Sequence, residues 1–145
     1  MKVSTKGDYG LRALVELALH YGQGPVQSAE IAARQRIPEP YLDQLLTTLR
    51  RAGFIRSVRG PQGGHALMRP PEEMRLSEVL LALEGSLSPI GWLDGPDGGR
   101  PGCDAQRPVW EAVRDATFKI LDGVTIAELA EKERQRLGEG DRYVI

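Results

Sequence analysis

A polar helix face in the first half of the chain carries side chains that could read the edges of nucleic-acid bases. Gln44, Thr47, Thr48 and Arg51 follow Pro40 at the spacing of one face of a helix. A solvated face more often carries several glutamates and lysines, whereas only Arg51 is charged here. Amides and hydroxyls supply the donors and acceptors that bond base edges in the DNA major groove. The pattern therefore favours a groove-reading helix.

A glycine-rich segment follows this helix and offers a second contact with nucleic acid. Arg59 precedes Gly60 and Pro61, and Gly63 and Gly64 complete the segment. An arginine at such a turn could enter a narrow minor groove, where the electrostatic potential is most negative. The glycines could let the backbone approach phosphates, or they could serve the geometry of the turn alone. No Gly-Lys-Ser/Thr sequence follows, which argues against a nucleotide-binding phosphate loop.

The single cysteine, Cys103, limits the metal and redox chemistry of the chain. One thiol excludes an intrachain disulfide and an all-cysteine zinc or iron–sulfur site within one chain. Cys103 could be a redox sensor, because a lone thiol in an exposed loop can be oxidised to a sulfenic acid or an intersubunit disulfide. The simpler interpretation is an incidental surface cysteine. No catalytic triad, carboxylate pair or metal-spaced set stands out, so we expect no enzyme, no metal site and no cofactor.

The distribution of charge is uneven although the chain is nearly neutral, with a formal net charge of −1. Residues 34–69 carry 7 arginines against 2 carboxylates, whereas residues 81–145 have a net charge of −4. A local basic patch would suit nucleic-acid contact, and scattered solvated arginines would give the same counts. The longest apolar run is too short to span a bilayer, so we expect a cytoplasmic protein without a membrane partner.

We expect a mainly α-helical fold with one small β-hairpin. Helical spacing and turn signals predict these elements in order: helices over about 5–21, 28–36 and 40–52, a hairpin over 54–69, and a helix over 76–85. Ser28 is the expected N-cap of the second helix. The third would bury Leu42, Leu45, Leu46 and Leu49. This order is that of a winged helix-turn-helix, whose third helix lies in the major groove, although winged modules also serve protein interaction.

The second half of the chain begins with a long loop and continues in two helices. The loop, about residues 86–105, is rich in glycine and proline and contains Trp92, which we interpret as a packing anchor. A capping box at Thr125 predicts the start of the sixth helix, and residues 138–145 are expected to be a frayed tail. The fifth helix, about 107–121, has an apolar stripe of Trp110, Val113, Thr117, Ile120 and Leu121.

Four segments in combination are specific enough to indicate a family. They are residues 4–7 (STKG), 9–13 (YGLRA), 40–46 (PYLDQLL) and 58–64 (VRGPQGG). Together they resemble a bacterial regulator family that includes the iron–sulfur cluster regulator, the nitrite-sensitive repressor and the cysteine-metabolism repressor. The resemblance covers residues 1–85 and, more weakly, 105–132. It implies a homodimeric transcription regulator, usually a repressor, that binds imperfect palindromes of double-stranded DNA.

The resemblance also implies a division of the chain. Residues 1–85 would form the DNA-binding winged helix-turn-helix, 86–105 a sensor-like loop, and 106–137 the dimerisation helix with the C-terminal helix, ahead of the tail. The fifth helix would cross to the partner subunit through its apolar stripe, which gives a two-fold interface that matches two DNA half-sites.

Individual roles follow from the resemblance and from the polar helix face. Gln44 would pair with adenine and Asp43 would accept from cytosine. Arg51 and Arg56 would contact phosphates, and Arg59 would enter the minor groove. The full set of candidate DNA-binding residues is Lys6, Ser28, Glu39, Pro40, Tyr41, Asp43, Gln44, Thr47, Thr48, Arg51, Arg56, Arg59, Gly60, Pro61, Gly63 and Gly64.

The chain departs from the family pattern in its sensor half. Cluster-binding members carry three cysteines in the loop, whereas this loop offers only Cys103. Asp8 resembles a fourth-ligand position, but we expect no cluster and take Asp8 to favour the positive end of its helix. A regulatory protein partner or a small effector is then the expected signal. The alternative is a protein-interaction module with weak DNA binding. His65 replaces a usual tyrosine and is interpreted as packing under the wing.

Overall fold

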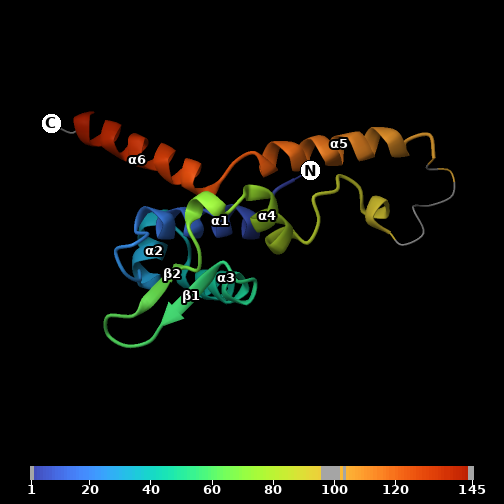
Figure 1. Cartoon of the computed structure of the whole chain (residues 1–145). Helices are drawn as coiled ribbons and strands as arrows, with labels where there is room; N and C mark the ends of the chain where they lie inside the picture. The colour runs from blue at the N-terminus through green and yellow to red at the C-terminus, as the bar shows by residue number, and fades with distance from the viewer. Residues whose placement is uncertain (1, 96–101, 103, 144–145) are drawn as a thin grey trace.

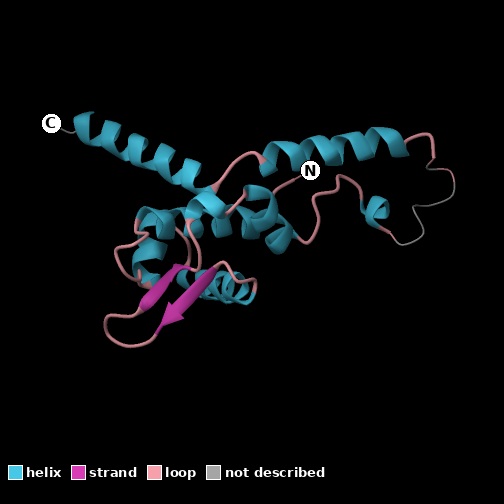
Figure 2. Cartoon of the chain, viewed as in Figure 1, coloured by secondary structure: helices cyan, strands magenta, loops and turns pink. Residues whose placement is uncertain are grey.

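The computed structural model describes residues 2–95, 102 and 104–143. Over these residues the chain forms six α-helices, two short 3₁₀ helices and one two-stranded sheet (Figures 1 and 2). The elements are α1 Thr5–Leu19, α2 Ser28–Gln35, α3 Glu39–Arg51, β1 Ile55–Val58, β2 Gly64–Leu67, η1 Pro71–Glu73, α4 Leu76–Glu84, η2 Gly91–Asp94, α5 Arg107–Asp122 and α6 Ile126–Tyr143. The predicted class, mainly α with a hairpin wing, is confirmed.

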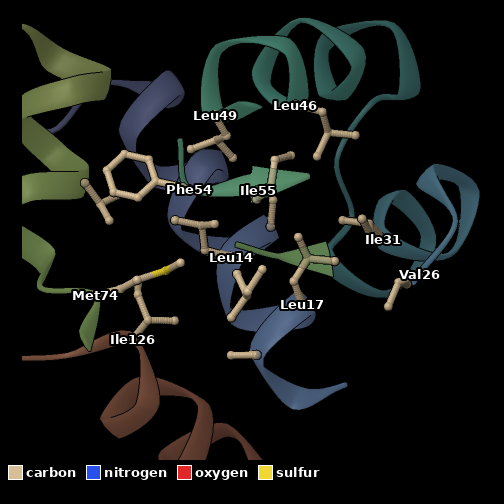
Figure 3. Close-up of a cluster of buried hydrophobic side chains, with 14 of the residues drawn as sticks. Leu14, Leu17, Val26, Ile31, Leu46, Leu49, Phe54, Ile55, Met74 and Ile126 are labelled. Atoms are coloured by element: carbon tan, nitrogen blue, oxygen red, sulfur yellow. The ribbon is translucent and has the colours of Figure 1, made fainter. Parts of the chain in front are cut away.

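The core gathers the apolar faces of α1, α2, α3 and α4 with the base of the hairpin. Leu14, Ile31, Leu42 and Leu49 are fully buried, as their helical spacing predicted. Figure 3 shows side chains of α1 and α3 meeting Phe54 and Ile55 at the start of the hairpin. Burial of about ten such side chains, at roughly 1.5–3 kcal/mol each, is the main stabilisation of this unit.

The helix α6 is joined to this core although it comes last in the chain. Ile126 and Ala130 on its first turns are buried, and Figure 3 places Ile126 beside Met74. The Ile126 amide donates to the Met74 carbonyl at 2.8 Å, and the Leu76 amide donates to Val124 at 2.9 Å. These bonds fix the start of α6 next to α4, so a movement of α6 would be felt by α1 and α4.

The helix α5 lies outside this core. None of its residues is buried, and it packs along the end of α4 and against η2. In Figure 1, α5 and α6 lie on one side of the molecule, while α3 and the hairpin lie on the opposite side. The fold therefore separates two surfaces, one built from α3 and the hairpin and the other from α5.

Three sequence expectations differ from the structure. Ser28 is the first residue of α2 and its side chain makes no cap bond, because it is bonded to His65 instead. The second strand was predicted to extend to residue 69, but β2 ends at Leu67. The tail expected from residue 138 begins within a helix, because α6 continues to Tyr143.

Candidate nucleic-acid interface

The helices α2 and α3 form a tight helix-turn-helix. Arg36 adopts the left-handed conformation (φ 55°, ψ 49°) that ends α2, and the Ile37 amide donates to the Ala32 carbonyl at 3.0 Å. Ile37 is buried in the turn and holds the two helices together. Because the buried face of α3 points into the core, its opposite face is presented to solvent.

The exposed face of α3 carries the candidate base-reading groups. Asp43 and Gln44 are exposed, in company with Glu39 and Pro40 at the start of the helix. The hydroxyls of Thr47 and Thr48 are half-buried and donate to the Asp43 and Gln44 carbonyls at 2.9 and 3.1 Å. These hydroxyls remain available as acceptors only, whereas the Gln44 amide and the carboxylates of Glu39 and Asp43 are exposed polar groups of the first turns.

Tyr41 and Lys6 occupy different environments. The Tyr41 ring is half-buried and meets the Tyr9 ring edge-on, with centroids 5.7 Å apart. The contact joins the start of α3 to α1, so Tyr41 orients the helix as well as lining its surface. Lys6 is exposed in the first turn of α1.

The hairpin is short and its glycines serve different purposes. Its strands pair antiparallel from Ile55 with Leu67 to Val58 with Gly64. Gly63 is buried, and a Cβ there would overlap the Val58 carbonyl oxygen. Gly64 has φ 145° and lies against the Val26 backbone. At these two positions the structure supports the turn-geometry interpretation.

The tip of the hairpin is open to solvent. Gly60 (φ 107°), Pro61 and Arg59 are all exposed, as is Arg56 on β1. The tip is also tied to the helix-turn-helix, because the Gln27 side-chain amide donates to the Pro61 carbonyl at 3.1 Å. Sequence analysis missed this bond, which joins positions 34 residues apart.

The arginines of this surface have no internal counter-ions. Among the residues that the structure describes, no carboxylate pairs with five of them: Arg36, Arg50, Arg51, Arg56 and Arg59. All five are exposed, on α3, on the hairpin and in the turn before α3. Exposed guanidinium groups without counter-ions on neighbouring elements favour contact with a polyanion.

His65, which was expected to pack under the wing, also forms side-chain hydrogen bonds to two other elements. It is half-buried between Ser28 on α2 and Ser57 on β1. Burial and the neighbouring Arg50 guanidinium lower the pKa of its imidazole from the usual value, and the Asp43 carboxylate opposes this. The ring is therefore mainly neutral near pH 7.

The apolar stripe predicted for α5 varies in exposure. Trp110, Thr117 and Leu121 are half-buried, whereas Val113 and Ile120 are exposed and belong to the outer face of the helix. Ile120 has 69% of its surface accessible. Sequence analysis missed Val109, which is 58% accessible and extends the outer face. A line of exposed aliphatic side chains at helical spacing is typical of an interaction surface.

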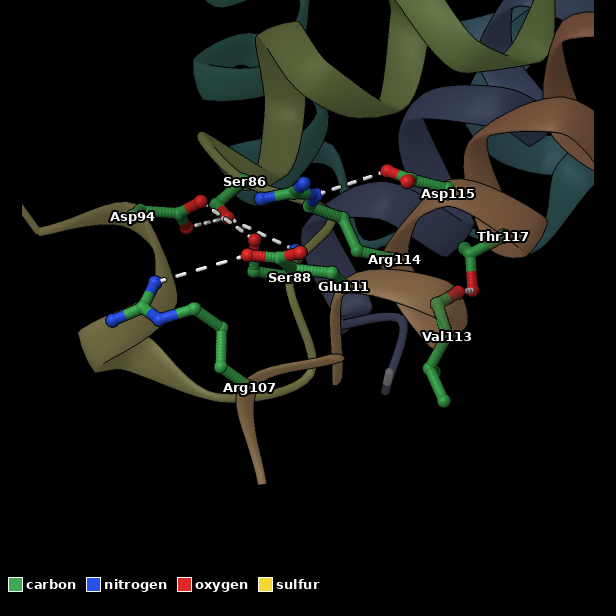
Figure 4. Close-up of polar contacts among 9 residues, drawn as sticks. All are labelled: Ser86, Ser88, Asp94, Arg107, Glu111, Val113, Arg114, Asp115 and Thr117. Atoms are coloured by element: carbon green, nitrogen blue, oxygen red, sulfur yellow. Dashed lines mark hydrogen bonds and ion pairs between the residues drawn. The ribbon is translucent and has the colours of Figure 1, made fainter. Parts of the chain in front are cut away.

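The first part of the glycine-rich loop is folded against α5. Asp94 accepts hydrogen bonds from the Ser86 and Ser88 hydroxyls, the latter at 2.6 Å, and these bonds lower the pKa of its carboxyl group (Figure 4). The Arg107 guanidinium lies over the Trp92 ring at 5.2 Å, as expected of a packing anchor. A cavity of about 490 Å³ opens beside Asp94, between the end of α4 and α5.

The donor set does not fit an iron–sulfur cluster. Such clusters are held mainly by cysteine thiolates, and this chain has one cysteine, Cys103, which lies outside the described residues. Asp8 is paired with Arg12 through both oxygens, at 3.0 and 3.1 Å. In the described part of the chain no three His, Cys, Asp or Glu side chains gather as metal ligands. Among the described helices, none has an apolar stretch that could span a bilayer.

Comparison with known proteins gives a consistent result over nearly the whole chain. The model of the Rrf2 family, described as iron-dependent transcriptional regulators, matches residues 3–132. The HTH-type transcriptional regulator CymR of Bacillus subtilis is 38% identical over 130 residues, which are 90% of each chain. The regulator IscR of Cereibacter sphaeroides is 40% identical over 138 residues, or 92% of this chain and 89% of that one.

Solved structures agree with these sequence relatives. The structure of CymR, the global cysteine regulator of B. subtilis, superimposes with a TM-score of 0.77 and covers 91% of this chain and 98% of that one. The structure of T. potens IscR gives a TM-score of 0.75 at 40% identity and covers 92% and 88% of the two chains.

Proposed function

The chain belongs to the Rrf2 family of transcriptional regulators, and on that premise we propose that it is a homodimeric, sequence-specific DNA-binding repressor without an iron–sulfur cluster of its own. Its relatives are regulators and not enzymes. The observation that carries the proposal is the set of five arginines on α3, in the turn before it and on the hairpin, none paired with a described carboxylate. Phosphates of double-stranded DNA would supply the missing anions.

Recognition would divide between the helix and the hairpin. Gln44 would bond adenine, and Asp43 would accept from cytosine and repel a misplaced phosphate. Arg51 and Arg56 would hold the backbone and set the register of the protein on the duplex. Arg59 at the exposed tip would enter the minor groove.

Two such units would be joined through the outer face of α5. Val109, Val113 and Ile120 would pack against the same residues of a second copy, which gives a two-fold interface. The axis of this dimer would lie opposite the DNA-binding surface, since α5 and α3 are on opposite sides of the molecule (Figure 1). A two-fold protein reads two half-sites, so the operator would be an imperfect palindrome.

Selection of genomic DNA fragments by the purified protein, at a low and a moderate salt concentration, tests this function. We expect one enriched palindromic sequence whose binding weakens steeply as salt increases, because phosphate contacts release counterions. Addition of a thiol oxidant asks whether Cys103 is the sensor, since release of the DNA would then follow oxidation.

Absence of enrichment at either salt concentration would contradict DNA binding by the free protein. The alternative, a winged-helix module that binds a protein partner, would then be favoured by the net charge of −4 on residues 81–145. A small effector that fits the cavity beside Asp94 would be the other remaining signal.

A further inference from the structure

The side chain of His65 joins three elements of the DNA-binding surface. Its Nε2 lies 2.9 Å from the Ser28 hydroxyl at the start of α2, and its Nδ1 lies 2.9 Å from the Ser57 hydroxyl on β1. Arg50 near the end of α3 donates to the same Ser57 oxygen at 3.4 Å. The backbone of His65 also exchanges two hydrogen bonds of 2.8 Å with Val26.

A neutral ring with its proton on Nε2 satisfies every group in this chain of bonds. Arg50 donates to the Ser57 oxygen, Ser57 donates its hydroxyl proton to Nδ1, and Nε2–H of His65 donates to Ser28. Bonds ordered in one direction strengthen one another. The chain runs from α3 through the hairpin to α2, so it fixes three elements relative to each other.

Together with the backbone bonds to Val26 and the bond from Gln27 to Pro61, these side-chain bonds hold a hairpin that buries few residues of its own. Each strand has four residues, and an isolated two-stranded hairpin is marginal in water. Only Ile55 and Leu67, at the base, are buried in the core. Arg59 lies beyond the last strand pair, Val58 with Gly64, so a small rotation at the base displaces its side chain.

We propose that His65 is a positioning residue, which sets the angle of the hairpin on the α2–α3 pair and thereby places Arg59 for DNA binding without contacting DNA itself. The proposal rests on the DNA-binding function proposed above. A tyrosine or phenylalanine at this position would pack in the same space, but neither has two ring nitrogens to bridge both serines.

Three substitutions distinguish the two hydrogen bonds by which His65 bridges Ser28 and Ser57. His65→Leu removes both, His65→Gln can reproduce the Nε2 bond to Ser28, and His65→Asn can reproduce the Nδ1 bond to Ser57. We expect His65→Leu to weaken binding to the selected operator about tenfold, and the amides to recover about half of that loss on a logarithmic scale. His20→Gln is the matched control, because His20 is the only other histidine.

A double-mutant cycle with Arg59→Ala tests positioning directly. If His65 acts through Arg59, the loss caused by Arg59→Ala should be at least threefold smaller in the His65→Leu protein than in the wild type. Losses that multiply without coupling would overturn the proposal, and so would unchanged affinity in His65→Leu.

Amide hydrogen exchange supplies a readout that needs no DNA. We expect faster exchange across residues 55–67 in His65→Leu, with α3 unchanged and with partial protection restored by the two amides. Unchanged exchange in the hairpin would contradict the proposal even if the protein binds no DNA. Wild-type protein that fails to bind any fragment, with the exchange result as expected, would contradict the proposed function alone.

Discussion

The arginines of α3 and the hairpin differ from those of α5 and α6 in one respect. On α5 and α6, four arginines have a carboxylate partner, such as Arg107 with Glu111 and Arg134 with Glu131. On α3 and the hairpin, Arg51 and Arg59 are also exposed, but they have no carboxylate partner among the described residues. Exposed ion pairs contribute little stability, so the difference concerns function more than folding.

The same two surfaces also differ in how they expose apolar groups. The α3 helix buries all four leucines of its apolar face, whereas α5 leaves Val109 and Ile120 in solvent. A charged surface without counter-ions suits DNA, and an aliphatic surface without cover suits a second protein chain. The two proposed contact surfaces thus lie on opposite sides of the molecule, and substitutions on one side should not alter the other directly.

The largest expected effect comes from breaking the aliphatic surface of α5. Ile120→Asp would place a charge in the proposed interface, and we expect loss of the dimer at micromolar concentration with at least about a hundredfold weaker operator binding. Sedimentation and gel-shift titration measure the two quantities. Leu137→Asp on α6, also at an exposed aliphatic position, is the control and should change neither. A dimeric Ile120→Asp protein would place the interface elsewhere.

The next largest effect is expected from a substitution in the turn of the hairpin, which should lower stability. Gly63→Ala would drive a Cβ into the Val58 carbonyl, and we expect the free energy of unfolding to fall by about 2 kcal/mol. Chemical denaturation measures this change. Gly138→Ala, at a helical position in α6 with open space around it, should instead raise stability by roughly 0.5–1 kcal/mol. Equal stabilities of the Gly63→Ala and wild-type proteins would show that the turn accepts another conformation.

Removal of an unpaired arginine should have a smaller effect on DNA binding than loss of the dimer. We expect Arg59→Ala to weaken specific binding about tenfold, because one favourable minor-groove contact per subunit is lost. Footprinting and titration on the selected operator measure the loss. An intact footprint at the hairpin site would contradict the assignment of Arg59 to the minor groove.

The pH dependence of DNA binding should be smaller still. Since burial and Arg50 lower the pKa of His65 in the free protein, and nearby phosphates would raise it, DNA binding would take up a proton. Affinity should therefore rise about threefold as pH falls from about 7.5 to 6. Around the ring the other ionisable groups are Asp43 on α3, Arg56 on β1 and His20 beside the same pocket.

Titrations of the wild type, His65→Gln and His20→Gln across this pH range identify the group. The pH dependence should disappear in His65→Gln and persist in His20→Gln. Persistence in His65→Gln would assign the proton to another residue.

No effect is expected from iron. Anaerobic reconstitution with iron and sulfide should leave the protein colourless, because one cysteine per chain cannot supply the thiolates of a cluster. Visible absorbance and metal analysis measure this. A stable brown species that contains iron and sulfide would contradict the conclusion that the side chains of this protein do not fit an iron–sulfur cluster.

Sequence periodicity predicted the buried residues of α3 in full and those of α5 only in part. Leu42, Leu45, Leu46 and Leu49 were predicted as one buried face and are buried, because a helix in a small domain has only one direction in which to bury such a face. On α5 the same reasoning joined Trp110 and Ile120 into one stripe, of which Trp110 is half-buried and Ile120 is exposed. Periodicity identifies apolar positions, but not whether they meet their own chain or another.

The contacts of His65 show a second limit of sequence analysis. Ser28, Ser57 and His65 come from three elements, and no local pattern indicates that they meet. Ser28 was expected to cap α2 because serine is common at that position, but its hydroxyl bonds the ring instead. Such bridges depend on tertiary packing, which local sequence patterns do not reveal. The roles proposed for the exposed residues remain predictions.

The most direct test of the account is the salt dependence of operator binding in two matched arginine variants. Arg51→Gln removes an arginine without a described partner, and Arg134→Gln removes one paired with Glu131. The account predicts that Arg51→Gln lowers the slope of log affinity against log salt by about 0.9 per subunit, while Arg134→Gln leaves it unchanged. Equal slopes in both variants and the wild type would contradict the claim that the unpaired arginines contact phosphates.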